Sequence, residues 1–295
     1  MSVRIAFACL LLCSVACGTR AEYAAAASKP IRWTPPALGT DQYESSPSLS
    51  PDGRELFFFR ADRQFDHYRL LHSRCEDGRW SHPREPAFAA APGVLETDPA
   101  FSPDGRRLYY GSDRHKAQDL DLWRVERGAD DAWSPPQRLP EPVNSPHTEL
   151  LPREQADGRL LFGSDRPGGP GGGRDLYFAI PQEDGSWRVE PLPTPVNGPG
   201  DEYEADLSRD GRVLVVVANR GERSHLYVYD REGEGWRERG QVPAREDVFQ
   251  VGPLLSPDGK RLLFAQDQGK DSGELYLVDL APGADPSWPP ACGGR

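Results

Sequence analysis

Hydrophobic residues in this chain occur in short bursts separated by polar turns rich in glycine and proline. An Asp-Gly pair recurs at spacings of 52, 53, 53 and 48 residues, and its glycines are Gly53, Gly105, Gly158, Gly211 and Gly259. An apolar burst follows each pair, and a second burst with Leu-Tyr or Leu-Trp alternation follows the next loop. Short apolar runs bounded by turn residues are typical of strands, so the pattern predicts a chain of many short strands.

Each repeat has room for four strands. One strand precedes the Asp-Gly turn, one follows it, a third carries the Leu-Tyr or Leu-Trp alternation, and a fourth carries a tryptophan. These tryptophans are Trp80, Trp133, Trp187, Trp236 and Trp288. One four-stranded antiparallel sheet per roughly 50 residues is the size of a β-propeller blade. The sequence therefore predicts an all-β propeller of about five blades, with a sixth, degenerate blade left open.

The turn at the start of each repeat has a local cause. In Ser102-Pro103-Asp104-Gly105, proline presets the first corner and glycine adopts the left-handed conformation at the last. The third and fourth repeats carry Ala156 and Arg209 in place of the proline but keep Asp-Gly. The common requirement is therefore the turn geometry.

Two terminal segments compete to close the ring. The segment IRWTPPAL around Trp33 and the tail PSWPPAC around Trp288 both resemble a fourth strand. We expect one of them to complete the last blade and the other to pack beside it. On this interpretation residues 31–295 form a single domain, preceded by a linker over 17–30.

The N-terminus is typical of an export signal. Arg4 precedes an apolar run, Ile5 to Cys17, that is too short to span a bilayer. Ser14-Val15-Ala16-Cys17-Gly18 is similar to a bacterial lipobox, which predicts a signal peptide over 1–16 and lipidation of Cys17. Ordinary cleavage near Ala21 or Ala27 is the alternative. We expect a periplasmic protein held at the outer membrane by a lipid anchor only.

Cysteine content and charge narrow the picture further. Cys75 and Cys292 are the cysteines that remain beyond Cys17, and either a bridge between them or two free thiols fits an oxidising compartment. The net charge is −11, and no basic stripe with interleaved aromatic residues occurs. Nucleic acid is therefore not an expected partner.

The repeats resemble the TolB-type, WD40-like propeller family, whose repeat is named for its Pro-Asp core. The resemblance covers about residues 31 to 290 and rests on Ser-Pro-Asp-Gly, Ser-Asp-Arg at 112–114 and 164–166, and Val-Asn at 143–144 and 196–197. The fifth repeat departs from it, with Gln266-Asp267-Gln268 in place of Ser-Asp-Arg. The six blades and separate N-terminal domain of TolB are not visible in this sequence. The resemblance implies protein partners in the cell envelope, with peptides or glycans as further candidate ligands.

Charged residues recur at two positions that a propeller brings to one face, namely the connection entering the first strand and the loop between the second and third. The candidate binding residues there are Glu44, Glu96, Asp113, Arg114, Glu149, Asp165, Arg166, Glu202, Glu204 and Arg220. They could form a ring that binds a ligand at the channel mouth. The structural alternative, which we favour, pairs them between neighbouring blades and lets the aspartates cap their own loops.

Signatures of catalysis are absent from the sequence. There is no Gly-x-Ser-x-Gly and no His-Glu-x-x-His, and the six histidines lack metal-ligand spacing. The segment 168–173 (GGPGGG) lacks the Gly-Lys-Ser/Thr of a phosphate loop and is expected to be a flexible turn. We therefore expect no catalytic residue, metal or cofactor, and a non-enzymatic binding or scaffold protein. The alternative is a carbohydrate-active hydrolase using channel carboxylates, but near-equivalent acids do not provide the unequal pair that it needs.

Overall fold

The computed structural model describes residues 28–245, 247–267 and 272–292, and every regular element in these ranges is a β-strand. The all-β class expected from the repeats is thus confirmed. No helix in the described ranges is long and apolar enough to cross a membrane. The expected signal peptide and Cys17 lie outside the described residues.

Twelve of the described strands form three separate four-stranded antiparallel sheets. Group two consists of β6 (Glu96–Phe101), β7 (Arg107–Lys116), β8 (Asp119–Glu126) and β9 (Gln137–Arg138). Group three consists of β10 (Glu149–Glu154), β11 (Leu160–Ser164), β12 (Asp175–Pro181) and β13 (Trp187–Pro191). Group four consists of β14 (Asp201–Leu207), β15 (Val213–Asn219), β16 (Ser224–Glu232) and β17 (Gly235–Gln241).

The other eight strands form one mixed sheet that divides at a single parallel bridge, Tyr43 to Gly273. Group one consists of β2 (Tyr43–Leu49), β3 (Glu55–Ala61), β4 (Tyr68–Glu76) and β5 (Arg79–Trp80). Group five consists of β18 (Gln250–Leu255), β19 (Arg261–Asp267), β20 (Gly273–Asp279) and β1 (Ile31–Arg32). Of the two terminal candidates, the segment before Trp33 is the one that pairs with β20, while Trp288 lies outside any strand.

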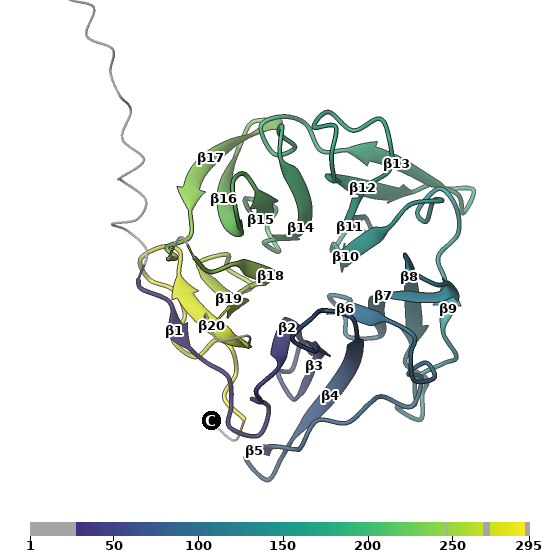
Figure 1. Ribbon diagram of the computed structural model, residues 1–295, viewed down its shortest axis with the longest axis vertical. Coiled ribbons are helices and arrows are strands. Elements are labelled where there is room, and N and C mark those ends of the chain that lie inside the picture. Colours follow the sequence, from purple (N-terminus) through teal and green to yellow (C-terminus); the bar gives the residue numbers. More distant parts are fainter. Residues whose placement is uncertain (1–27, 246, 268–271, 293–295) are drawn as a thin grey trace, which may run out of the picture.

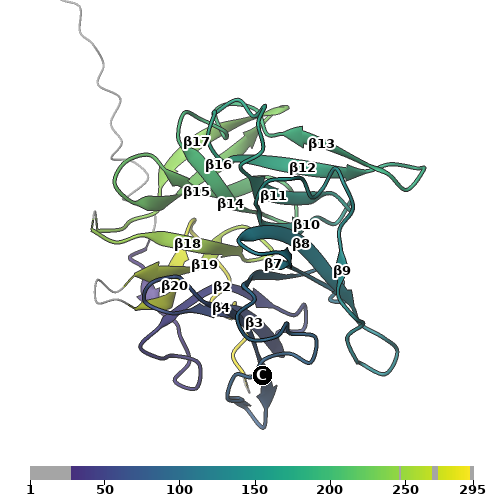
Figure 2. The same ribbon diagram turned by 45° about the vertical axis from the view of Figure 1, so that its right-hand side comes forward.

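The groups are arranged around a common centre, with the first strand of each group innermost (Figure 1). These inner strands contact one another in cyclic order, β2 to β6, β10, β14, β18 and back to β2. Figure 2 shows that the sheets are inclined to one another around the centre. Apolar bursts of neighbouring groups pack together, as when Leu161 and Leu176 of group three meet Leu214 and Val216 of group four. Burial between sheets accounts for the β-branched and aromatic composition of these bursts.

The Ser-Pro-Asp-Gly turn forms as its residues predict. In the second repeat, Ser102 Oγ donates to Asp104 Oδ1 at 2.6 Å, and the Gly105 amide donates to the Ser102 carbonyl at 2.9 Å. Gly105 has φ of 71°, a region that side chains resist. The turns lie at the end of the ring opposite the connections that enter the inner strands.

The last described residues are tied to group one. Cys292 joins Cys75 of β4 in a disulfide, with 5.3 Å between the Cα atoms. The bonded cysteines are 217 residues apart in sequence. Two long-range links, this bond and the pairing of β1 with β20, therefore hold the two ends of the described chain to the ring.

Candidate functional site

The inner strands enclose a cavity of about 640 Å³ at the end of the ring where they begin. Each of the five inner strands contributes to the lining near its start. The residues at equivalent positions there are Ser45, Thr97, Leu150, Tyr203 and Val251. The loops between second and third strands add further lining residues. The cavity therefore opens on the face where the sequence places its recurring charged residues.

Asp98 and Glu204 are buried carboxylates in the cavity wall that form no ion pair with any described residue. Asp98 accepts hydrogen bonds from Ser46 Oγ at 2.7 Å and from the Leu151 amide at 3.3 Å. Glu204 accepts one from the Gly252 amide at 2.6 Å. Each carboxylate thus reaches from its own group to the inner strand of a neighbouring group.

Burial shifts the ionisation of both carboxylates. It raises the pKa of Asp98, and together with the nearby negative charge of Asp98 it raises the pKa of Glu204 to about 8. Glu204 is therefore easier to protonate than an exposed glutamate. Asp98, held by a hydroxyl and an amide, has a different environment.

A bulge in the inner strands aims these side chains. The pairing of β6 with β7 shifts register between Thr97 and Ala100, and Asp98 in the bulge has φ of 54°. Ser46, Leu151 and Gly252 occupy the corresponding bulges with φ of 47°, 38° and 64°. Such backbone is sparsely populated by residues other than glycine, so contacts with the neighbouring strand must hold it in place.

Aromatic side chains line the part of the cavity where groups five and one meet. The ring of Tyr43 lies 4.5 Å from that of Phe65 and 5.7 Å from that of Phe249, measured between centroids. Tyr68 extends the cluster, 6.3 Å from Phe65. We call these four residues the aromatic wall.

Cations stand among the cavity-lining residues as well. Arg174 and Arg223 are exposed and line the cavity, and the Arg174 guanidinium lies over the ring of Tyr203 at 5.8 Å. The site thus combines an apolar wall, buried acids that differ in their hydrogen-bond partners, and exposed guanidinium donors. This combination can bind a polar molecule that also presents an apolar face.

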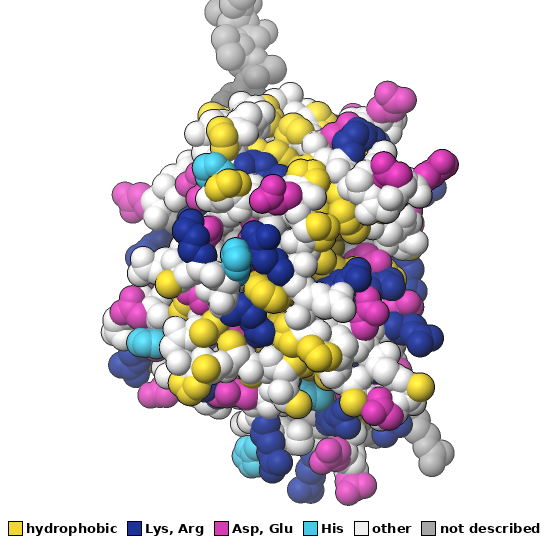
Figure 3. All heavy atoms as spheres, turned by 90° about the vertical axis from the view of Figure 1, so that its right-hand side faces the viewer, with side chains coloured by type: hydrophobic (Ala, Val, Ile, Leu, Met, Phe, Trp, Pro, Cys, Tyr) yellow, Lys and Arg dark blue, Asp and Glu magenta, His cyan; other side chains and the backbone are white. Residues whose placement is uncertain are grey.

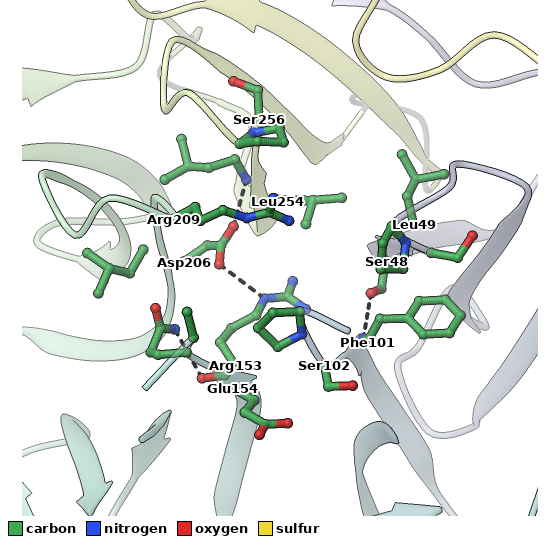
Figure 4. A pocket seen from close by; sticks show the side chains of 18 of the residues that line it. Ser48, Leu49, Phe101, Ser102, Arg153, Glu154, Asp206, Arg209, Leu254 and Ser256 are labelled. Atoms are coloured by element: carbon green, nitrogen blue, oxygen red, sulfur yellow. Dashed lines mark hydrogen bonds and ion pairs between the residues drawn. The ribbon is translucent and has the colours of Figure 1, made fainter. Parts of the chain in front are cut away.

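At the opposite end the channel is narrowed by Arg153. Its guanidinium donates to the carbonyls of Pro99 at 3.3 Å and Pro253 at 2.9 Å, and its Nε lies 3.7 Å from Asp206 Oδ1. Figure 4 shows this side chain pointing toward Asp206, and both residues line a second cavity of about 200 Å³. One arginine therefore ties group three to groups two, four and five.

Half of the predicted charged residues belong to a clamp, which is an ion pair between an acid and an arginine of the same group, in groups one, two and three. Glu44 accepts from Arg60 Nε at 2.8 Å, Glu149 accepts from Arg166 at 2.9 Å, and Glu96 pairs with Arg114. Each acid lies in the first strand of its group, and its arginine lies in the second strand or, for Arg166, just after it. The pairing between neighbouring blades that the structural alternative expects is therefore wrong for these pairs.

The arginines also hold the segment that enters their group. Arg166 donates to the carbonyls of Pro142 at 2.8 Å and Val143 at 2.6 Å, and it lies over the rings of Phe162 and Tyr177. Arg114 donates to the Phe88 carbonyl in the same way. The clamp therefore fixes the entering connection, which is a structural role.

The aspartates of the predicted set cap loops. Asp113 accepts from the amides of Leu95 at 2.8 Å and Gln118 at 3.0 Å, and Asp165 accepts from the Thr148 amide at 2.9 Å. Of the ten candidates, the structure brings only Glu44 and Glu204 to the cavity lining.

Group four departs from this clamp. Arg220 donates to Glu238 at 2.8 Å and pairs with the Tyr229 hydroxyl, and Glu202 makes no ion pair with any described residue. The Glu202 carboxylate accepts instead from the Gly198 amide at 2.8 Å.

Sequence reasoning did not find Asp98, Arg174 or the aromatic wall. One signal was available, because Asp98 follows Glu96 by the same two residues that separate Glu204 from Glu202. The aromatic wall had no comparable signal, since Phe249 precedes β18 of group five while the other three residues belong to group one.

The surface carries both signs of charge. On the face shown in Figure 3, acidic and basic side chains are interspersed with apolar ones. Within the described residues, no three His, Cys, Asp or Glu side chains form a group placed to hold a metal ion.

No protein family model and no curated protein matches the sequence. Solved structures do match it. A putative TolB from Agrobacterium tumefaciens has 17% identity and a TM-score of 0.52, with 78% of this chain and 72% of that one covered. TolB from Acinetobacter baumannii has 16% identity and a TM-score of 0.52, with 82% of this chain but only 56% of that one covered.

A family 117 glycoside hydrolase from the marine bacterium Zobellia galactanivorans is also similar. It has 11% identity and a TM-score of 0.57, with 88% of this chain and 93% of that one covered. Identities this low carry no function across, and binding proteins and enzymes share folds of this kind. Together with the cyclic arrangement of sheets, these likenesses show that the chain has a β-propeller fold.

Proposed function

We propose that the chain is a non-enzymatic, TolB-like binding protein of the cell envelope. Each strand group is one blade of a five-bladed ring closed by β1, and a lipid at Cys17 anchors the protein to the outer membrane from the periplasmic side. The partner is an envelope protein that inserts a peptide segment into the central cavity. Peptide binding is favoured over glycan binding because the cavity offers aromatic and arginine side chains together.

The aromatic wall carries this proposal. Tyrosine and arginine are the residues that most often dominate protein interfaces, and here Tyr43 and Tyr68 stand in one cavity with Arg174. A partner segment with an apolar side chain would pack on the wall. Its polar groups would face Glu204 and the arginines.

Crosslinking in cells, followed by identification of the bound proteins, tests the proposal. Phe65→Ala and Arg174→Ala should each weaken recovery of the same partner, by about tenfold or more if they are anchor residues. Arg212→Ala at the opposite, turn-bearing end is the matched control and should leave recovery unchanged. Cys17→Ala should release the protein from the membrane while the cavity still binds. Recovery of no envelope protein, or equal recovery with both cavity variants, contradicts the proposal.

One observation favours a second candidate, a carbohydrate-active hydrolase. The sequence suggested near-equivalent acids, but Asp98 and Glu204 share the cavity in different hydrogen-bond environments. A panel of polysaccharides separates the two candidates. Turnover that falls by about a hundredfold or more in Glu204→Gln and Asp98→Asn, and not in Glu149→Gln, would replace the binding proposal with the enzyme. No turnover across the panel, with partner capture retained, opposes the enzyme.

A further inference from the structure

Glu202 is the acid at the clamp position of group four, and it has lost its arginine. The side chain is fully buried, and its Oε1 atom has no hydrogen-bond partner. Arg220, the counterpart of Arg166 in group three, is engaged by Glu238 and Tyr229. A buried carboxylate without a countercharge is costly unless something else neutralises it.

Two more carboxylates stand near Glu202, at the junction of groups three and four. Asp175 begins β12, is 1% exposed, and has an Oδ2 atom without a partner. Asp201 begins β14. Burial raises the pKa of Glu202; the Gly198 amide and the charge of Arg220 oppose this rise, and the charges of Asp175 and Asp201 add to it. None of the three forms an ion pair within the described residues, so the junction holds concentrated negative charge.

The glycine-rich segment 168–173 packs directly on this junction. The Gly171 amide donates to Asp175 Oδ1 at 3.2 Å, and the Arg174 amide donates to Asp201 Oδ1 at 3.1 Å. A Cβ atom on Gly169 would lie 1.9 Å from Asp175 Oδ2, and one on Gly171 would lie 2.1 Å from the Gly198 carbonyl oxygen. The glycines are therefore needed for close packing around these oxygens, a role beyond that of the flexible turn expected from the sequence.

Carboxylate and carbonyl oxygens lie close together at two places in this junction. A Cβ atom on Gly171 would also lie 2.8 Å from Asp175 Oδ1, which places that carboxylate beside the Gly198 carbonyl. A Cβ atom on Gly200 would lie 3.2 Å from Glu202 Oε1 and 2.7 Å from the Asn219 carbonyl oxygen. Carboxylate and carbonyl oxygens, without nitrogen or sulfur, are the ligands that calcium prefers.

We propose that the junction of groups three and four binds a divalent cation, Ca²⁺ in preference to Mg²⁺, through Asp175 Oδ2 and Glu202 Oε1. Nearby carbonyl oxygens and water complete the coordination. No three acidic side chains of the described residues are arranged around one point, so carbonyls and water must supply most of the ligands. Ca²⁺ accepts such a flexible set of oxygen ligands, whereas Mg²⁺ demands a nearly ideal octahedron. The bound ion would neutralise the buried charge and tie two groups together.

The test uses the full mature chain after removal of metal ions with a chelator. Calorimetric titration with CaCl₂ should show one site, with a dissociation constant in or below the range of about 10⁻⁴ to 10⁻³ M that is usual for extracellular modules. Ca²⁺ should raise the unfolding temperature, and MgCl₂ at the same concentration should raise it much less. Tb³⁺ bound at the junction should show luminescence sensitised by Tyr203, which adjoins Glu202 in the chain.

Variants locate the ion. Glu202→Gln and Asp175→Asn should each weaken Ca²⁺ binding by about tenfold to a hundredfold. After chelation, Glu202→Gln should be at least as stable as the parent chain, because the substitution removes repulsion between buried carboxylates. Glu149→Gln alters the corresponding clamp position of group three and should leave the Ca²⁺ response intact.

Two results would overturn the proposal. The first is a parent chain that takes up neither Ca²⁺ nor Tb³⁺ at millimolar concentration, in which case the carboxyls hold protons. The second is undiminished Ca²⁺ binding in both Glu202→Gln and Asp175→Asn, which would place the ion elsewhere. The titrations of the parent chain decide the first point even if a variant fails to fold.

Discussion

At the scale of single residues, the clamp shows how one arginine makes several contacts at once. Glu149 is fully buried, and Arg166 neutralises it while donating to two carbonyls of the entering connection. The planar guanidinium can make these bonds and lie over Phe162 and Tyr177 at the same time, which an ammonium group cannot do. The repeated Ser-Asp-Arg of the sequence is therefore best explained by what each group needs to hold its entry segment.

Arg166→Ala should be strongly destabilising, because it leaves a buried carboxylate without a countercharge. We expect a loss of about 3 kcal/mol in the free energy of unfolding, measured by urea denaturation. The exposed Arg212→Ala is the matched control and should change stability by less than about 0.5 kcal/mol. Adding Glu149→Gln to Arg166→Ala should recover part of the loss. A loss no larger than that of the control would mean that the clamp is not structural.

At the scale of elements, ion pairs link neighbouring groups at the turn-bearing end. Arg107 of β7 makes two hydrogen bonds to Glu154 of β10, at 3.0 and 2.9 Å. Glu55 of β3 pairs with Arg127, which follows β8, and with Arg74 at 3.0 Å. Ion pairs thus join neighbouring groups at the turn-bearing end of the ring. Hydrogen bonds of Asp98 and Glu204 join them closer to the opposite end.

Glu55 makes the link between groups one and two sensitive to acid. Burial alone would raise the pKa of Glu55, but the His72 ring and Arg127 outweigh it and lower the pKa to about 2. The folded-state pKa lies below the unfolded value of 4.5, so its stabilisation is present above pH 4.5 and is lost as the pH falls toward 2. The shift corresponds to roughly 3 kcal/mol at most.

Urea denaturation at pH 6 and pH 3 checks this expectation. The parent chain should lose more stability between these pH values than Glu55→Gln, which has already lost the carboxylate. Glu183→Gln, an exposed acid without an ion pair among the described residues, should follow the parent chain. Identical pH dependence in parent and Glu55→Gln would show that the ion pair carries no acid sensitivity.

The elements also show how far the sequence could be interpreted. Strands and turns were predictable because their causes are local, as in the hydrogen bonds of Ser102 and Asp104. The sequence could not predict whether the Trp33 or the Trp288 segment adds a strand to the last group. Both segments have strand-like composition, and the outcome depends on pairing with β20. The sequence could not predict the place of Asp98 in the cavity wall, because it depends on a bulge and on contacts with a neighbouring strand. The unpaired Glu202 could not be recognised either, since only the structure shows Arg220 engaged elsewhere.

At the scale of the whole molecule, both ends of the described chain are tied to the two groups that share the mixed sheet, β1 to group five and Cys292 to group one. Group five contacts group one through one parallel bridge and the contacts of their inner strands. The disulfide between Cys75 and Cys292 adds a covalent link between group one and the segment that follows group five. The bond closes nearly the whole described chain into one loop, so its effect on the unfolded state is large.

Loss of this bond should lower stability more than loss of any single clamp. The loop-closure relation gives about 5 kcal/mol for a separation of 217 residues, and measured losses for native disulfides are about 2 to 5 kcal/mol. Urea denaturation of the parent chain with and without reductant should show this loss. Cys75→Ser combined with Cys292→Ser should be as unstable as the reduced parent and should no longer respond to reductant. Equal midpoints for the oxidised and reduced parent would mean that strand pairing and packing alone keep the ring closed, with β1 on β20 as the main terminal link.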